Sequence, residues 1–279
     1  MQSGFGKILN IFAKLGLDFN AGRKYQEIRK KDINQTLSEL ILNCNLLIAE
    51  IKNQLHKIDK KNIIFIIEDM EKLHLHVAEE IFYNYPKQLT SISCSFIFTF
   101  PISLVYYHRF TNIIGEFDSA LTLPMIKVHD KNGRDYEPGI KNITNIVHKR
   151  IDKKKNFISE SLLKEFVRLS GGCLRDLFRM VKLAAENSLD REKEKIEKID
   201  FEYSVNKLKE DYYNTISFNE RTGLSAEDYY KILADCCNSK DKKPLDVKGL
   251  IDLKHNMSIL GYNGDSWFDV HPVVKKILI

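Results

Sequence analysis

The feature that most constrains the fold is a run of five apolar residues, Ile63–Ile67, four of them β-branched. Glu68 and Asp69 follow it directly. A continuous apolar run of this length is typical of a strand that is buried on both faces, as in a parallel sheet. A helical pattern runs from about residue 75 to 89, and a second strand is predicted at Cys94–Thr99.

A third strand is predicted at Leu121–Val128, after a helix or turn at Ile102–Asn112. Pro101 separates the second strand from that helix, since proline cannot continue a central strand. The order strand, helix, strand, helix, strand is the signature of an α/β fold. We therefore predict an α/β core over residues 61–138.

Helical segments flank this core. Residues 1–60 have a helical pattern, with Asn34 or Thr36 as a candidate cap for its second apolar stripe. Residues 139–215 are predicted to be all-α. The helices expected there are 139–151, 159–169 up to Gly171-Gly172, 173–188, and one capped by Asp200 that reaches about Asp211.

The final segment, residues 225–279, is predicted to form a separate small unit. Ser225 and Asp228 have the spacing of a capping box at the start of a helix. A second helix is expected at Leu245–Met257, and Asn263-Gly264 is a hairpin signal between two short strands. Two helices followed by a hairpin are typical of a winged helix.

Polar residues end both of the first two predicted strands. Glu68 and Asp69 follow the first strand, and Thr99 ends the second. Ligands of α/β sheets bind at the carboxyl ends of the strands, so these side chains are candidate site residues. Two plainer explanations remain open: an acidic first turn favoured by the helix dipole, and an ordinary strand-end threonine.

A third candidate is Arg175, at the start of the helix that follows Gly171-Gly172. A guanidinium group in this place can reach a phosphate with a planar, charge-assisted fork. The alternative is a surface arginine in a helix–turn–helix.

In order and spacing, these motifs resemble the second half of an AAA+ ATPase: Walker B, sensor 1, then a lid domain with sensor 2. The phrases IIFIIEDMEKL, FIFTFPISL and LSGGCLRDLFRMVKLA look most like origin-recognition-type and STAND-type ATPases, and the tail YNGDSWFDVHPVVKKIL is similar to their winged-helix end. The resemblance covers about residues 60–279. It implies a P-loop-type parallel sheet, an all-α lid and a winged-helix-like unit.

The resemblance also implies roles for individual residues. Glu68 matches the Mg²⁺-binding acid, Asp69 the catalytic acid, Thr99 sensor 1 and Arg175 sensor 2. In complete relatives ATP and Mg²⁺ are the ligands. Two further arginines, Arg109 and Arg150, are candidates for a trans-acting arginine, with a solvated or salt-bridged arginine as the alternative.

The sequence departs from the family pattern in its phosphate-binding loop. No G-x-x-x-x-G-K-Ser/Thr occurs, and the nearest phrase, Ser3–Ile8, has Ile8 where the Mg²⁺-binding hydroxyl belongs. Glu68 also stands where the family has Asp, which shifts the carboxylate by about one methylene from the geometry that Mg²⁺ demands. We therefore expect the C-terminal part of a longer ATPase, with a sheet that lacks its central strand and with little ATPase activity alone.

Composition sets the remaining expectations. The net charge of +5 is mildly basic, 29% of residues are charged and the five cysteines are scattered, so we expect a cytoplasmic protein with reduced thiols and no membrane span.

Expected partners are a second copy, or a chain that supplies the missing ATPase half. The rival function is a non-enzymatic protein- or DNA-binding module that uses the winged helix. An unrelated α/β protein is the third alternative. The lysines expected to contact DNA phosphates are Lys240, Lys242, Lys243, Lys248 and Lys254.

Overall fold

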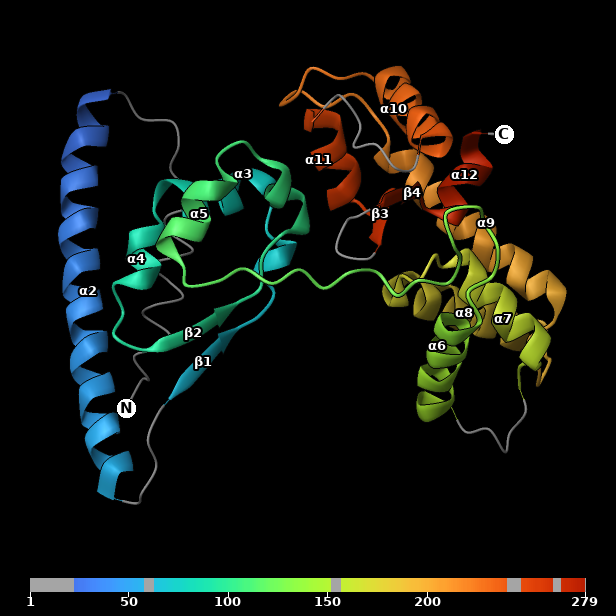
Figure 1. The fold of residues 1–279 in the computed structure, drawn as a ribbon, viewed down its shortest axis with the longest axis horizontal. Coiled ribbons are helices and arrows are strands. Elements are labelled where there is room, and N and C mark those ends of the chain that lie inside the picture. Colours follow the sequence, from blue (N-terminus) through green and yellow to red (C-terminus); the bar gives the residue numbers. More distant parts are fainter. Residues whose placement is uncertain (1–22, 58–62, 152–156, 240–246, 263–266, 279) are drawn as a thin grey trace. The chain divides into compact units, whose positions relative to one another are not determined.

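The chain is mostly helical and has two small sheets of two strands each within its described residues (Figure 1). The computed structural model describes residues 23–57, 63–151, 157–239, 247–262 and 267–278. It divides into two compact units. The smaller unit comprises residues up to Glu68 together with Tyr85–Phe98, and the larger one comprises Asp69–Asn84 and Thr99–Ile279.

The smaller unit contains the first sheet. Its elements are α2 (Arg23–Lys57), β1 (Ile64–Ile67), α4 (Pro86–Thr90) and β2 (Ser95–Phe98). The two strands pair in parallel, with Ile64 opposite Ser95 and Ile67 opposite Phe98. The prediction of neighbouring strands in an α/β arrangement is confirmed for these two, and the centroids of the Phe65 and Phe96 rings stack 5.3 Å apart.

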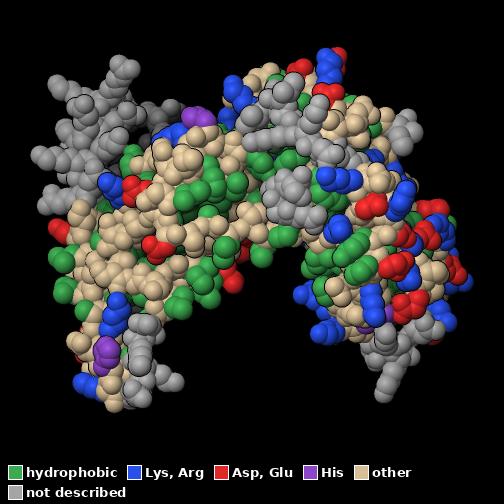
Figure 2. All heavy atoms as spheres, viewed as in Figure 1, with side chains coloured by type: hydrophobic (Ala, Val, Ile, Leu, Met, Phe, Trp, Pro, Cys, Tyr) green, Lys and Arg blue, Asp and Glu red, His purple; other side chains and the backbone are tan. Residues whose placement is uncertain are grey.

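The prediction that the first strand is buried on both faces is wrong. All four residues of β1 are exposed, and Ile66 keeps 61% of its surface accessible. Ile97 of β2 is 54% exposed. The reason is that two strands and the described helices of this unit are too few to cover the sheet, so apolar side chains lie on the surface over β1 and β2 (Figure 2).

Helix α2 is attached to the loop before β2 by polar contacts. The Asn45 side chain donates to the Ser91 carbonyl (3.1 Å) and accepts from the Ser93 amide (2.7 Å), while Lys52 Nζ donates to the Ser93 carbonyl (2.7 Å). Because α2 already begins at Arg23, neither Asn34 nor Thr36 caps it, which corrects that prediction. The phrase Ser3–Ile8 lies outside the described residues.

The larger unit opens with short helices that follow the strand tips. They are the 3₁₀ helix η1 (Met70–Lys72), α3 (Leu75–Glu79), the π-helix η2 (Glu80–Asn84), the 3₁₀ helix η3 (Ile102–Tyr106) and α5 (Phe110–Glu116). One continuous helix over residues 75–89 was expected, but Pro86 interrupts it. Its ring disfavours a helical backbone at Tyr85, which adopts φ −130° and ψ 39°.

The third strand expected at Leu121–Val128 does not form. This segment has no strand pairing, and Leu121 and Leu123 are each 93% exposed. Its second half instead follows the C-terminal hairpin, where the Met125 amide donates to the Gly261 carbonyl (3.1 Å). Met125 packs against the cluster of Leu260, Tyr262 and Trp267 in this hairpin rather than completing the β1–β2 sheet, and this tertiary contact overrides the strand pattern.

The helices expected in residues 139–215 are confirmed with small shifts. They are α6 (Glu137–Arg150), α7 (Glu160–Leu169), α8 (Leu174–Asp190) and α9 (Lys198–Thr215). Asp200 was expected to cap the last helix from outside, but it lies in the first turn of that helix. Glu197 is the N-cap, and Asp200 Oδ2 accepts from its amide (2.8 Å) to complete a capping box.

The C-terminal segment contains the predicted helices and hairpin. Its elements are α10 (Ala226–Asn238), α11 (Val247–His255), β3 (Ile259–Tyr262), the antiparallel β4 (Trp267–Val270) and α12 (Pro272–Leu278). The capping box of Ser225 and Asp228 is present at the start of α10. The turn residues Asn263-Gly264 lie outside the described residues.

A buried carboxylate joins three of these helices. Asp176 of α8 is 1% exposed, and its Oδ2 accepts a hydrogen bond from Tyr212 of α9 (2.5 Å). The Nε2 atom of His271, the residue before α12, lies 3.5 Å from the same oxygen. Burial is the main cause that lowers the pKa of His271 to about 4, against which Asp176 acts. The imidazole is therefore neutral at pH 7.

This burial predicts an acid-sensitive fold. Above pH 6.5 the His271 side chain is neutral in both the folded and the unfolded chain. Between pH 6.5 and about pH 4, the unfolded chain binds a proton at His271 and the folded chain does not, so folding becomes less favourable as the pH falls. We expect about 3 kcal/mol of stability to be lost over that window through this group. His271→Asn, which keeps an acceptor for the Val273 amide, removes this part of the loss. Urea unfolding at pH 4–7 measures it, and equal pH slopes in both proteins would contradict the assignment.

Candidate functional site

The two parallel strands end at the same edge of their sheet. Ile67 and Phe98 are the last register partners, and Glu68 and Thr99 directly follow them. Parallel pairing therefore places a carboxylate and a hydroxyl at neighbouring strand ends, as the sequence predicts. Glu68 is exposed and Thr99 is half-buried.

Asp69 begins the turn out of the strand. Its backbone is left-handed, with φ 68°, a conformation that costs a non-glycine residue energy. Its side chain is 72% exposed and forms an ion pair with Lys72 Nζ (2.6 Å). Strained residues cluster at functional sites, so this outlier is consistent with a role for Asp69.

A hydrogen bond ties the acidic turn to the second strand end. The Met70 amide donates to Thr99 Oγ1 (3.0 Å). One residue further, the buried Oε2 atom of Glu71 has no hydrogen-bond partner among the described residues. Sequence reasoning did not select Glu71, although its place in the acidic phrase that contains Glu68 and Asp69 was the available signal.

Arg175 lies in the first turn of α8 and points its guanidinium group at its neighbour. Its Nε donates to Asp176 Oδ1 (3.2 Å), and its side chain remains 63% exposed. Among the described residues, no hydrogen bond or ion pair joins Arg175 to Asp69 or Thr99. The structure thus brings together the strand-end residues, while Arg175 belongs to the buried carboxylate cluster.

Both positions of the glycine pair before α8 require glycine for steric reasons. Gly171 and Gly172 both have positive φ, 58° and 89°. A Cβ on Gly172 would lie 1.9 Å from the Ile126 carbonyl oxygen, so the segment before α6 crosses this turn at backbone contact. The Tyr262 hydroxyl donates to the Gly171 carbonyl (2.6 Å) and fixes the hairpin to the same turn.

The two candidate trans-acting arginines have structural contacts. Arg109 donates to the Asn84 side chain and to the Tyr83 carbonyl, at 3.2 Å each. The Arg150 guanidinium lies 4.6 Å from the ring centroid of Phe178.

The described residues fit part of a Mg²⁺–nucleotide site. Mg²⁺ usually binds one or two carboxylates together with substrate phosphates, a part that Glu68 or Asp69 can fill. No described group of three His, Cys, Asp or Glu side chains is arranged to hold a metal ion alone. None of the described residues forms a glycine-rich loop after a strand, so they contain no phosphate cradle of that kind.

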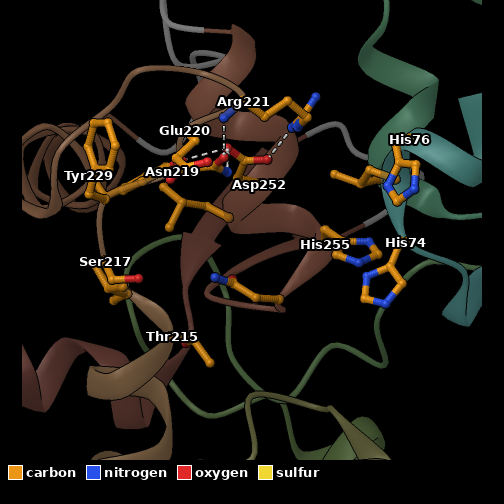
Figure 3. Close-up of a pocket in the computed structure, with 15 residues that line it drawn as sticks. His74, His76, Thr215, Ser217, Asn219, Glu220, Arg221, Tyr229, Asp252 and His255 are labelled. Atoms are coloured by element: carbon orange, nitrogen blue, oxygen red, sulfur yellow. Dashed lines mark hydrogen bonds and ion pairs between the residues drawn. The ribbon is translucent and has the colours of Figure 1, made fainter. Parts of the chain in front are cut away.

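Sequence reasoning missed a pocket in the larger unit. His74, His255 and Arg221 help to line it, although they are far apart in the sequence (Figure 3). No local motif marks such a site, since only tertiary packing assembles it.

Comparisons with protein-family models, curated proteins and solved structures found no match for this chain. None of the described helices is long and apolar enough to cross a membrane.

The glycine turn yields a paired prediction. Gly172→Ala combines a left-handed backbone with a backbone clash, and we expect it to lower the free energy of unfolding by at least about 3 kcal/mol. Gly223→Ala is the matched control, since Gly223 also has positive φ (75°) but a Cβ there meets no atom within 4 Å. The control is expected to cost about 1–2 kcal/mol. Chemical denaturation of both variants decides, and equal losses would disprove the close contact with Ile126.

Proposed function

We propose that this chain is an AAA+/STAND ATPase-like regulatory protein that contributes the Walker B, sensor 1, lid and winged-helix-like parts of such an ATPase. By itself it does not hydrolyse ATP. A segment or partner that carries a Walker A loop completes the nucleotide site. Glu68 then binds Mg²⁺, Asp69 acts on the attacking water, and Thr99 contacts the γ-phosphate or the water.

One observation carries the proposal. A parallel strand pair ends in an acidic turn on one strand and in a hydroxyl on the other, and the Met70 amide links the two by its bond to Thr99. This arrangement holds Asp69 and Thr99 at one edge of the sheet. The carboxyl edge of a parallel sheet is where such sheets bind ligands.

The exposure of the β1–β2 sheet supports the proposal that further strands or helices cover it. The side chains of Ile64 and Ile66 in β1 are exposed, with 59% and 61% of their surface accessible. Apolar side chains of this size normally lie in a core. Additional strands and helices are the structure that covers such a sheet in a doubly wound fold.

The rival function is DNA binding through the winged-helix-like end, and one of the five lysines expected to contact DNA is buried. Lys254 is 3% exposed, and its Nζ lies over the rings of Tyr106 (5.4 Å) and Phe268 (5.2 Å). It cannot contact phosphates without unfolding this packing. Lys248 is exposed, while Lys240, Lys242 and Lys243 lie outside the described residues.

Hydrolysis assays test the proposal. The chain alone is expected to turn over Mg²⁺-ATP far below the roughly 1 s⁻¹ ordinary for an enzyme. A covalent fusion to a strand–Walker A–helix segment that binds ATP is expected to hydrolyse it. In the fusion, Asp69→Asn is expected to lower turnover about 100-fold because the base is lost.

Asp118→Asn, an exposed carboxylate that is not one of the strand-end residues, is the control and is expected to leave turnover unchanged. A fusion that binds ATP but does not hydrolyse it contradicts the proposal. So does a fusion in which Asp69→Asn has no effect.

A further inference from the structure

The connection between α5 and α6 contains a stretch in which every residue from Asp118 to Pro124 is exposed. It forms neither helix nor strand, as Figure 1 shows. Leu121 and Leu123 are the most exposed large apolar side chains among the described residues, each with 93% of its surface accessible. Apolar side chains of this size normally lie in a core. Both leucines are therefore open to a partner that approaches from solvent.

The backbone of this stretch is as open as its side chains. Within the described residues, no backbone hydrogen bond involves any residue from Asp118 to Pro124. The bonds closest to it lie on either side, from the Phe117 amide to the Ile113 carbonyl (3.0 Å) and from the Met125 amide to the Gly261 carbonyl (3.1 Å). An exposed run of unpaired N–H and C=O groups can pair with a partner as an added strand.

Folded structure holds the chain on both sides of the stretch. Before it, Ile113 of α5 is 5% exposed. After it, the Ile126 carbonyl lies at backbone contact with Gly172, and the Tyr136 amide donates to the Val128 carbonyl (2.8 Å). A cut between these anchors removes no packed residue from either side, so the stretch can react without prior unfolding.

We propose that the Leu121–Thr122 bond is a cleavage site in the folded protein for an endopeptidase with an apolar S1 pocket. Such an enzyme binds its substrate as an extended strand, and Leu121 supplies the side chain for the pocket. The next leucine is a poor site, because the Leu123–Pro124 bond has no N–H group. The proposal goes beyond the ATPase-like function and does not depend on it, since no strand-end residue lies in the stretch.

The reaction requires only water and the endopeptidase. The C–N bond between Leu121 and Thr122 breaks, and the water oxygen ends on the new carboxylate of Leu121. Both water protons go to the Thr122 nitrogen, which becomes an ammonium group. The products are residues 1–121 and 122–279.

Contacts between the two products remain after the cut. Arg221 donates to the Tyr107 hydroxyl (3.1 Å) and forms an ion pair with Glu79 (3.4 Å). The rings of Tyr106 and Phe268 pack with their centroids 6.0 Å apart. Each of these contacts joins a residue before the cut to one after it, so we expect the products to stay bound. Cleavage then replaces a covalent connection between the strand ends and the lid-like helices by a noncovalent one.

Limited proteolysis of the full chain with chymotrypsin tests the proposal, because the S1 pocket of chymotrypsin is a hydrophobic slot. Mass spectrometry of the products identifies the bond that is cut first. A synthetic peptide of residues 118–127 gives the cleavage rate of an unfolded substrate. We expect the folded chain to be cut at Leu121–Thr122 within about 100-fold of the peptide rate, because no opening step precedes cleavage.

Two proline variants locate the cut. Thr122→Pro removes the N–H group of the scissile bond and is expected to slow cleavage there at least about 100-fold. Ala120→Pro is the matched control, since it places the same ring in the stretch but leaves the scissile amide unchanged. It is expected to be cut within about 3-fold of the parent rate. Both positions are exposed and have no backbone hydrogen bond among the described residues, so both variants are expected to fold.

Size-exclusion chromatography of the cleaved chain is expected to show the two products eluting together. Three results overturn the proposal of a cleavage site. They are a first cut at another bond within the described residues, cleavage more than about 100-fold slower than that of the peptide, and equal cleavage of Thr122→Pro and the parent. Products that separate on the column overturn the expectation that they stay bound.

Discussion

In a sheet of two parallel strands, each strand forms backbone hydrogen bonds along one edge only, so two strand edges and both faces of the sheet stay open. The smaller unit of this protein depends on that constraint. Among its described residues only Ile48 is buried. The strand ends that lead into Asp69 and Thr99 therefore belong to a sheet that has little core of its own. An ATPase-like function requires that further strands cover this sheet, which explains why we assign activity to a completed protein rather than to the chain alone.

The larger unit has an apolar core, and a buried carboxylate joins several of its helices. Asp176 connects α8 to Tyr212 of α9 and approaches His271 at the start of α12. Burying a charge is costly unless it is hydrogen-bonded, so these partners have to stay together for the fold to persist. Asp176 thus connects α8, α9 and the residue before α12, and Arg175 is held by its bond to Asp176.

Local signals predicted much of the fold. The capping box at Ser225 and Asp228 and the hairpin around Asn263-Gly264 depend on near neighbours, and both helices and strands form where these patterns indicate. Leu121–Val128 has strand propensity, but its backbone partner is Gly261, which no local pattern reveals. The pocket was equally hidden, because His74 and His255 are separated by most of the chain. The roles of Glu68, Asp69, Thr99 and Arg175 depend on the family resemblance and stay predictions.

We propose that the β1–β2 sheet is completed by a further part of an ATPase. Amide hydrogen exchange measures this most directly, since protection reports which backbone groups are covered and stably paired. In the chain alone, we expect the amides of Ile64–Ile67 to exchange far faster than those of Ile259–Tyr262 in the C-terminal hairpin, and to become protected in the Walker A fusion. Protection of Ile64–Ile67 in the isolated chain equal to that of the hairpin would contradict the account.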